Sequence, residues 1–214
     1  MIPLDRILIS SLLLFSLPAA QADQGQKVFS QGGQNPAAMA CQGCHGPDGL
    51  GMAAAGFPRL AGLPAGYLSK QLQDFRNGTR KNPIMEPLAK ALSDEEIAAV
   101  SASLAAMPAP ATPEVRRQQM ASSPAQALAL YGDWSRQIPG CVQCHGPGGV
   151  GVGEHFPPLS HQPAAYLVAQ LNAWRDGSRH NDPNQLMVGV AKAMTDEEVK
   201  AIADYFATGQ EAKP

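Results

Sequence analysis

The chain has 214 residues, enough for two small domains, with a formal net charge of −2 and only 6% aromatic residues. The near-neutral charge argues against a nucleic acid or an anionic membrane surface as partner. All four cysteines lie in two short motifs, so none is left for a structural disulfide. A small domain with few aromatic residues has a thin core, which a large apolar cofactor would complete.

The N-terminus predicts an export signal. Arg6 precedes an apolar run, 7–17, and a small-residue cleavage site, Ala20-Gln21-Ala22. Because the run is too short to span a bilayer, we expect residues 1–22 to be removed and a periplasmic chain to start at Asp23. A retained anchor is the alternative, since the basic region before the run is weak. No later segment is apolar enough to span a membrane, and peripheral membrane association is a further option.

Three helices are predicted in the first half of the mature chain. A first helix precedes the cysteines at about 24–29, and a middle helix covers about 65–76 and ends at Gly78. The last helix begins at a capping box, Ser93 with Glu96, and continues with apolar residues at helical spacing. The stretches between the helices are rich in glycine and proline and show no strand alternation, so no sheet is expected.

The second half of the chain repeats the first at an offset of 99 to 102 residues. A segment with three prolines, 108–114, separates the halves and is predicted to be an extended linker, because proline cannot continue a helix. The expected fold is therefore all-α, with domain one over 23–107 and domain two over 115–214. Matching residues include Phe57-Pro58 with Phe156-Pro157, Tyr67-Leu68 with Tyr166-Leu167, and Ser93 with Thr195, and the matching first and middle helices are expected at about 124–134 and 164–175.

Each repeat contains a Cys-x-x-Cys-His motif. Structural zinc needs four ligands and would leave the histidine unexplained twice. A redox dithiol needs a βαβ setting, and no strand is predicted to provide one. Covalent haem uses every residue of the motif, because two thiols bond to the two vinyl groups and the histidine binds the iron. Two covalently bound haem c groups are therefore predicted, one on Cys41, Cys44 and His45 and one on Cys141, Cys144 and His145.

The repeat also selects the second axial ligand of each haem iron. Among the methionines and remaining histidines, only Met85 and Met187 occupy matching positions, each eight residues before its capping box and in a loop after a proline. A thioether would fill the iron site and raise the potential relative to a second imidazole. Domain two is less regular, because it has two extra residues before Met187, and Met194 and His180 lie nearby as rivals.

Further contacts to the haems are predicted from residues that recur in both halves. The carbonyls of Pro58 and Pro157 could accept the ring N–H of the ligating histidines, with a tight loop as the alternative interpretation. Arginines after the middle helices could pair with haem propionates, with a solvated helix end as the alternative. Recurrent aromatic pairs are expected to pack around the haems. The arginines are Arg76, Arg80, Arg175 and Arg179, and the aromatic pairs are Phe29 with Tyr131, Tyr67 with Tyr166 and Phe75 with Trp174.

The order of these motifs resembles one family over essentially the whole mature chain. After a signal segment, one series of motifs occurs twice: CxxCHG, FPxL, Y-L-x-x-Q-L, G-x-R, Met and S/T-D-E-E. This series is similar to that of the dihaem cytochromes c of the c4 type. The resemblance implies two tandem class I cytochrome c folds whose His/Met haems face each other across a pseudo-twofold interface. It further implies a periplasmic electron carrier, often feeding a terminal oxidase.

Three functions compete at this stage. The main hypothesis is a protein without catalytic residues that shuttles single electrons between respiratory donors and a terminal oxidase or other acceptor. The alternative is a cytochrome subunit docked on a dehydrogenase, for example one that oxidises sulfide or an alcohol. A dihaem peroxidase or thiosulfate-oxidising enzyme requires an open iron site, against which two methionine ligands argue. The expected partners are redox proteins, either a membrane respiratory complex, a terminal oxidase or a dehydrogenase.

Overall fold

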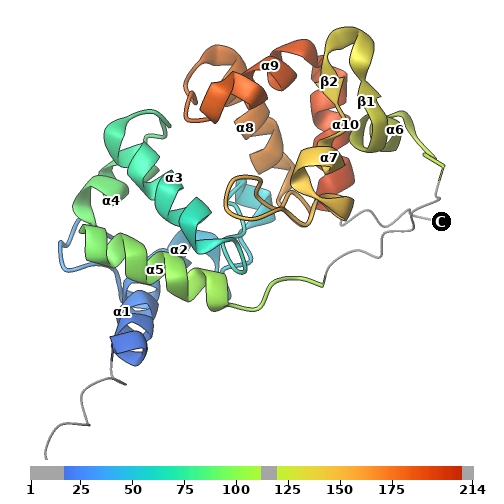
Figure 1. The fold of residues 1–214 in the computed structure, drawn as a ribbon. Coiled ribbons are helices and arrows are strands. Elements are labelled where there is room, and N and C mark those ends of the chain that lie inside the picture. The colour runs from blue at the N-terminus through green and yellow to red at the C-terminus, as the bar shows by residue number, and fades with distance from the viewer. Residues whose placement is uncertain (1–16, 112–119, 209–214) are drawn as a thin grey trace, which may run out of the picture.

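The structure is a computed structural model that describes residues 17–111 and 120–208 (Figure 1). The apolar run of the predicted export signal lies almost wholly outside the described residues, and so does the linker from residue 112 onward. The described residues fold into two helical domains, one before and one after the linker. The helical fold predicted from the sequence is confirmed.

The two domains contain their helices in the same order. Domain one consists of α1 (Leu17–Gln31), α2 (Gln42–His45), η1 (Ala53–Ala55), α3 (Ala65–Asn77), α4 (Met85–Ala91) and α5 (Asp94–Ala106). Domain two consists of α6 (Pro124–Tyr131), β1 (Gly132–Asp133), η2 (Trp134–Arg136), β2 (Ile138–Pro139), α7 (Cys141–His145), η3 (Pro147–Gly149), α8 (Ala164–Asp176), η4 (Pro183–Gln185), α9 (Leu186–Ala193) and α10 (Asp196–Ala207).

Local signals in the sequence set the ends of the longer helices. The side chains of Ser93 and Thr195 each accept a backbone hydrogen bond from the glutamate three residues later, and that glutamate bonds back to complete a capping box. The middle helices α3 and α8 end one residue later than predicted, where Gly78 and Gly177 adopt the left-handed conformation at φ 83° and 78°. The predicted capping boxes and middle helices are confirmed.

Four local predictions were wrong. Met85 and Met187 do not lie in loops, because Met85 begins α4 and Met187 is the second residue of α9. The sequence also predicted no sheet, whereas Gly132 and Asp133 pair with Pro139 and Ile138 in a short antiparallel hairpin. This hairpin ends α6 at Tyr131, three residues earlier than predicted. Tyr131 is consequently exposed rather than packed in the core.

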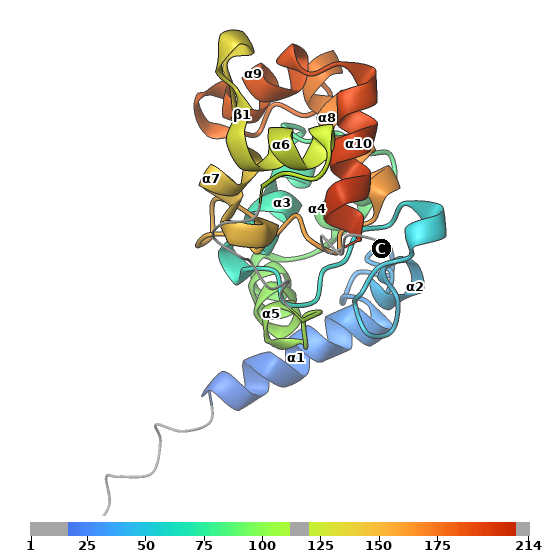
Figure 2. The ribbon, with the colours of Figure 1, turned by 90° about the vertical axis from the view of Figure 1, so that its right-hand side faces the viewer.

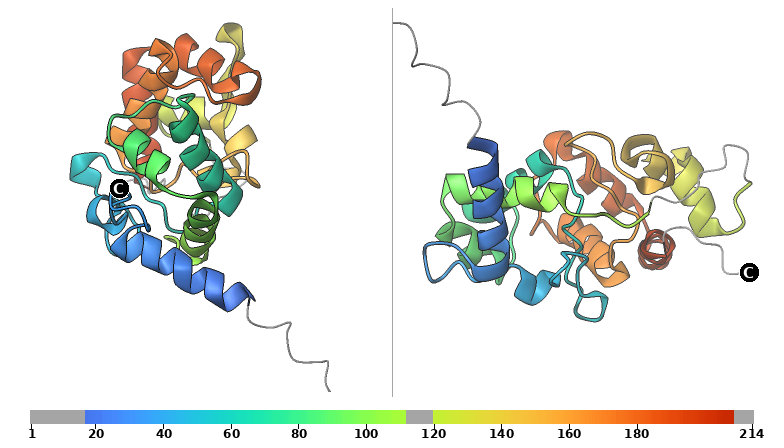
Figure 3. Two further views of the ribbon diagram at one scale, coloured as in Figure 1. Left: turned by 90° about the vertical axis from the view of Figure 1, so that its left-hand side faces the viewer. Right: turned by 90° about the horizontal axis from the view of Figure 1, so that it is seen from below.

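Each domain has a hydrophobic core of its own, built from one face of each of its longer helices. In domain one α1 packs across α5, on the side of the domain farthest from α6 (Figures 2 and 3). In domain two α10 packs against both α6 and α8. Phe29 and Phe206 are the largest fully buried side chains of the two cores. Separate cores mean that each domain can hold its own cofactor.

The domains meet along a short backbone bridge between the segments that follow α3 and α8. Lys81 N donates to Ser178 O at 2.8 Å, and His180 N donates to Thr79 O at 2.9 Å, so the bridge has the pseudo-twofold symmetry of the repeat. Within 17–111 and 120–208, no helix has the length and apolar character needed to cross a membrane.

Candidate haem-binding site

The Cys-x-x-Cys-His motifs form the single-turn helices α2 and α7. In domain one His45 N donates to Cys41 O at 2.9 Å, so the two thiols and the imidazole stand at helical positions i, i+3 and i+4 on one face. All four cysteines are free and half-buried. Burial raises the pKa of the Cys41 and Cys141 thiols to about 11.

Both motif histidines are buried and oriented by a proline carbonyl. Nδ1 of His45 lies 2.9 Å from Pro58 O, and Nδ1 of His145 lies 2.8 Å from Pro157 O. A carbonyl only accepts, so Nδ1 carries the proton and Nε2 is left with its lone pair. Burial lowers the pKa of both imidazoles, an effect that the carbonyl hydrogen bond partly opposes. Each ring is therefore held as a neutral ligand.

The loop that follows each histidine packs directly on the proline segment. Gly51 N donates to His45 O at 2.8 Å, and Gly51 has φ 86°. A Cβ at this position would lie 2.6 Å from Phe57 O and 2.7 Å from Arg59 N. Only glycine permits this approach, which holds the Pro58 carbonyl in reach of the imidazole.

One cavity of about 980 Å³ is lined by both domains. Its walls are mostly apolar, and they include the thioether and axial residues predicted for both haems. Trp174 also lines the cavity, and its buried indole Nε1 has no hydrogen-bond partner among the described residues. A cavity with free thiols, neutral imidazoles and an unpaired buried donor fits a large apolar group that carries carboxylates, as haem does. In the described part of the chain, no cluster of three or more His, Cys, Asp or Glu side chains is arranged to hold a metal ion.

The two candidate methionine ligands are half-buried and line this cavity from the start of a helix. Met85 N donates to Asn82 Oδ1 at 2.9 Å, whereas Met187 N donates to Asp182 Oδ2 at 2.8 Å. Between Arg179 and Met187 domain two has three more residues than domain one has between Arg80 and Met85. Within this longer segment Asn184 and Gln185 adopt left-handed φ angles of 59° and 56°. The insertion thus leaves the methionine in the first turn of a helix in both domains.

The rivals of Met187 have other surroundings. Met194 is buried in the core of domain two, where it takes the position that Leu92 has in domain one, although both side chains reach the cavity wall. His180 is exposed, and its Nδ1 lies 3.2 Å from Gly177 O. Met194 and His180 therefore differ from Met85 both in their surroundings and in their position in the repeat.

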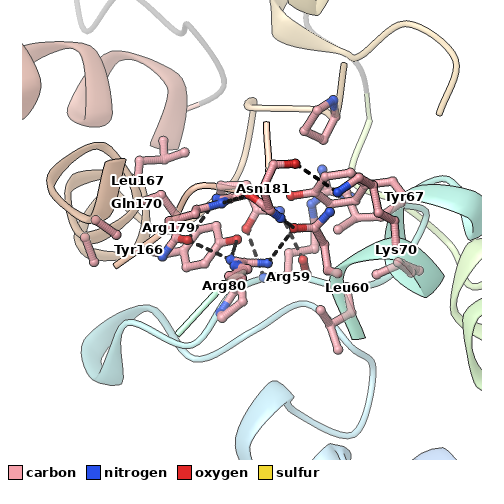
Figure 4. A pocket seen from close by; sticks show the side chains of 18 of the residues that line it. Arg59, Leu60, Tyr67, Lys70, Arg80, Tyr166, Leu167, Gln170, Arg179 and Asn181 are labelled. Atoms are coloured by element: carbon pink, nitrogen blue, oxygen red, sulfur yellow. Dashed lines mark hydrogen bonds between the residues drawn. The ribbon is translucent and has the colours of Figure 1, made fainter. Parts of the chain in front are cut away.

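Arg80 and Arg179 lie buried in the centre of the domain interface rather than in a solvated helix end (Figure 4). Arg80 donates to Gln170 Oε1 at 2.7 Å and to Tyr166 OH at 2.8 Å, both in the other domain. Arg179 returns the contact by donating to Gln71 Oε1 at 3.1 Å. Each guanidinium also stacks on the aromatic residue of its own domain, with 4.5 Å from Arg80 to the Phe75 ring and 4.1 Å from Arg179 to the Trp174 ring.

The positive charges of Arg80 and Arg179 are stabilised to different extents by the groups around them. Burial by itself lowers the pKa of both, but interactions with Tyr166, Tyr67 and Asp74 more than offset it at Arg80, so that the pKa of Arg80 is raised. Burial and the nearby Arg80 charge keep the pKa of Arg179 lowered. Two buried cations close together call for an anion of matching charge, which haem propionates would supply.

A further contact joins the domains on one side only. Lys70 donates to Asp74 and also to Asn181 O, the latter at 2.9 Å, while Asn181 Nδ2 donates to Asp74 Oδ2 at 2.7 Å. The positions that match Lys70 and Asp74 in domain two are Ala169 and Ala173. The clamp therefore has no symmetric copy.

Arg76 and Arg175 bind protein rather than facing the cavity. Arg76 donates to Leu92 O at 2.7 Å and pairs with the exposed Asp94. Arg175 donates to Ala191 O at 2.7 Å, also near the end of the methionine-bearing helix, and pairs with Asp196. These arginines satisfy carbonyls at the ends of α4 and α9 and so fix the helices that begin at the methionines.

Sequence reasoning missed several residues of the interface. Gln71 and Gln170 carried a signal, because both recur in the Y-L-x-x-Q-L motif. Asp74 and Gln162 carried none, since the matching residues are Ala173 and Leu63. Their partners lie about a hundred residues away along the chain, and only the docked domains bring them together.

The family model described as cytochrome c matches residues 22–108 and 129–210, one match in each domain. A thiosulfate dehydrogenase electron acceptor from Stutzerimonas stutzeri (strain A1501) is 62% identical over 195 residues, which cover 91% of this chain and 90% of that protein. Cytochrome c4 from Pseudomonas aeruginosa (strain PAO1) is 46% identical over 208 residues, covering 95% of this chain and 98% of the other.

A solved structure of similar fold is the thiosulfate dehydrogenase TsdBA from Marichromatium purpuratum in its as-isolated form. The superposition has a TM-score of 0.79 at 45% sequence identity. It covers 87% of this chain but only 40% of that longer chain. The similarity therefore concerns one portion of the longer protein.

Proposed function

This chain belongs to the cytochrome c family, as a two-haem electron carrier of the cytochrome c4 type, and on that basis we propose that it accepts electrons from a thiosulfate dehydrogenase. The observation that supports this proposal most strongly is the 62% identity, over nine-tenths of both chains, to a protein named as a thiosulfate dehydrogenase electron acceptor. Identity to a cytochrome c4 is lower, at 46% over a similar span. The comparisons thus favour the dehydrogenase partner over the oxidase-linked shuttle that the sequence alone suggested first.

A second observation supports a direct contact with the dehydrogenase. In Marichromatium purpuratum a region of similar fold is part of one longer chain that is named a thiosulfate dehydrogenase. A covalent link keeps an electron donor and acceptor at high effective concentration. A separate chain such as this one would have to reach the same contact by docking.

The residues of each motif have distinct roles in this proposal. The thiols of Cys41 and Cys44, and their counterparts Cys141 and Cys144, would hold a haem c through thioether bonds. His45 and His145 would bind the iron through the free Nε2, and Met85 and Met187 would supply the second protein ligand of each iron. The haems, when bound, supply the one-electron couple of iron between Fe(II) and Fe(III). If both residues ligate, each iron would have no open position for a substrate, as suits a carrier whose named relatives are an electron acceptor and a cytochrome.

The surrounding residues would orient the histidine ligands and neutralise the haem carboxylates. The carbonyls of Pro58 and Pro157 hold each imidazole in one tautomer and make it a better donor to the iron. Arg80 and Arg179 would pair with the haem carboxylates at the interface, where the protein offers them mainly neutral partners. The mostly apolar walls of the cavity exclude water and limit the reorganisation that accompanies a change of charge.

The location and boundaries follow from the same proposal. A carrier with covalent haem and an export signal over 1–22 belongs in the periplasm. The mature chain would then start at Asp23, with domain one over 23–107, the linker over 108–114 and domain two over 115–214. The first match to the family model ends at residue 108, where this linker begins, and the second starts at residue 129, after it.

The direct test is reduction of the purified holoprotein by a purified thiosulfate dehydrogenase with thiosulfate, followed at the haem absorption bands. We expect reduction whose rate rises with dehydrogenase concentration and that exceeds the rate with cytochrome c4 from Pseudomonas aeruginosa by at least about tenfold, equivalent to roughly 1.4 kcal/mol of preferred interaction. A chain that is reduced by dithionite but not by this mixture would rule the proposal out.

The second candidate is the oxidase-linked shuttle, favoured by near-complete coverage of a cytochrome c4. The two functions are compatible if the chain takes electrons from the dehydrogenase and delivers them to an oxidase. Oxidation of the reduced holoprotein by membranes that contain a terminal oxidase tests the delivery step separately.

A further inference from the structure

One peptide group of domain one has hydrogen bonds on both of its polar atoms, and the two bonds lead to different domains. The group joins Pro58 to Arg59. Its oxygen accepts from His45 Nδ1 at 2.9 Å, and its N–H donates to Gln162 Oε1 of domain two at 3.1 Å. The axial histidine of domain one is thus connected to a side chain of domain two through a single amide.

The Gln162 side chain is fixed in the orientation that this contact needs. Its Nε2 donates to Arg59 O at 3.0 Å, so the amide of Gln162 pairs with the main chain of Arg59 as a neighbouring strand would. A flipped amide would place donor against donor and acceptor against acceptor. Gln162 and Arg59 are only 4% and 3% exposed, so water does not compete for these bonds.

The matching peptide of domain two cannot do the same. His145 Nδ1 lies 2.8 Å from Pro157 O, as in domain one, but the next residue is Pro158. Proline has no backbone N–H, so this amide accepts from the histidine and has nothing to donate. The residue that corresponds to Gln162 is Leu63, which has no acceptor on its side chain. A side chain of domain two is therefore linked to the histidine of domain one, but no side chain of domain one is linked in this way to the histidine of domain two.

We propose that Gln162 of domain two tunes the iron potential of domain one through this peptide. The inference depends on the proposed role of His45 as an axial ligand, and it is independent of the thiosulfate partner. Electron delocalisation couples the N–H and C=O of an amide, so a hydrogen bond donated by Arg59 N–H makes the Pro58 oxygen a stronger acceptor. A stronger acceptor on Nδ1–H makes the imidazole more electron-rich, which favours Fe(III) and lowers the potential.

Docking of domain two thus lowers the potential of the domain-one haem, and domain one does not return the effect. An electron shared by the two haems is shifted toward domain two. A change of 10–30% in one hydrogen bond to a charged or metal-bound partner corresponds to roughly 1.5- to 5-fold in the equilibrium between the haems.

The first experiment is a redox titration of holoprotein carrying Gln162→Leu, the residue of domain one at this position, with the haems resolved by NMR. We expect the domain-one potential to rise by the equivalent of about 1.5- to 5-fold while the domain-two potential stays unchanged. The Nδ1–H resonance of His45 should move upfield, and the amide of Arg59 should exchange faster. An unchanged domain-one potential, or equal shifts in both haems, would overturn the proposal.

A matched pair of variants separates the N–H from the buried charge beside it. Arg59→Ala and Arg59→Pro both remove the guanidinium, which donates to Ala61 O and Ser160 O, but only Arg59→Pro removes the N–H. The domain-one potential should be higher in Arg59→Pro than in Arg59→Ala, and Gln162→Leu should add nothing once Pro is at position 59. Equal potentials in the two variants would also overturn the proposal.

The same samples distinguish failure of this inference from failure of the axial assignment. Absorption and NMR spectra typical of His/Met ligation, together with an unmoved potential, reject only the role of Gln162. A domain-one spectrum that His45→Ala leaves unchanged would instead reject His45 as ligand.

Discussion

The two domains agree at the residues that hold each haem and differ at the surfaces where the domains meet. The histidine-to-carbonyl distances are 2.9 Å for His45 and 2.8 Å for His145, and both motifs are followed by the same glycine loop. At the interface Asp74 of domain one contacts Asn181, whereas the matching residue of domain two is Ala173. A repeated unit can keep one cofactor geometry while its contacts diverge, because a contact made by one domain need not be returned by the other.

The largest expected effect tests whether the two haem sites are independent. Cys41→Ser combined with Cys44→Ser should remove the thioether bonds of domain one and halve the covalent haem content of the chain. Domain two should keep its haem, because its hydrophobic core is separate. Intact mass and haem absorbance per chain measure this directly.

The matched variant is Cys141→Ser with Cys144→Ser, which should give the converse result. If either pair of substitutions removes both haems, the domains do not fold and load as separate units.

The next effect compares the methionine ligands. Met85→Ala should open the iron of domain one to carbon monoxide and lower its potential by a substantial part of the roughly 0.8 V that axial ligands span. Met187→Ala should do the same in domain two. Carbon monoxide difference spectra and a redox titration measure both changes.

Domain two supplies its own control through Met194, which is buried where domain one has Leu92. Met194→Leu should leave the domain-two ligation intact. Loss of the methionine-to-iron band in Met194→Leu, with retention in Met187→Ala, would show that the ligand of domain two had been misassigned.

A smaller effect concerns the one-sided clamp at the interface. Asp74→Ala gives domain one the residue that domain two has and removes charged hydrogen bonds with Lys70 and Asn181. We expect the free energy of unfolding to fall by about 1.5–3 kcal/mol, as measured by denaturant titration.

The exposed ion pair between Asp94 and Arg76 is the comparison for this clamp, because Asp94 is 73% exposed. Asp94→Asn should change stability by less than about 0.5 kcal/mol. Equal effects of Asp74→Ala and Asp94→Asn would mean that the clamp adds nothing beyond a surface pair.

The smallest effect is a pH response confined to domain two. Hydrogen bonds from Ser135 and Arg136 lower the pKa of Asp133 to about 2, and Arg136 also lowers the pKa of Glu198. Because these folded-state pKa values lie below the unfolded ones, near 4, the stabilisation is complete above pH 4 and is lost as the pH falls toward 2. The hairpin of β1 and β2 should therefore loosen in acid.

Hydrogen exchange at the hairpin amides, corrected for intrinsic pH dependence, measures this loosening. The matching segment of domain one, 32–40, contains no ionisable side chain, and it reaches the last helix through the Gln34 N–H on Glu96 Oε1 rather than through an arginine, so it lacks the Arg136 contribution. Arg136→Gln should abolish the response, and hairpin protection that is constant down to pH 2 would contradict the assignment.

The sequence predicted what depends on neighbours along the chain. A Cys-x-x-Cys-His motif places its thiols and imidazole within about one helical turn, so its chemistry can be predicted without knowledge of the tertiary structure. The capping boxes of α5 and α10 depend on a residue and the glutamate three positions later, and both were predicted correctly. Comparison of the two halves then separated Met85 and Met187 from the other methionines.

The local predictions failed where tertiary packing overrides composition. Residues 132–139 contain too few residues to signal strands, and the hairpin there is held partly by Arg136, which reaches Glu198 on α10. Tyr131 was assigned to the core by analogy with Phe29. Ala129, twelve residues before Cys141 as Phe29 is before Cys41, is the buried residue instead.

By itself the sequence determined the cofactor, the number of haem sites, the helical fold and the repeat, because each is written in spacings of a few residues or in the comparison of two halves. Only the tertiary structure decided which residues of one domain face the other. Arg80 meets Gln170, and the peptide of Arg59 meets Gln162, across separations of 90 and 103 residues. No local pattern specifies such contacts, because they depend on how two finished domains pack against each other.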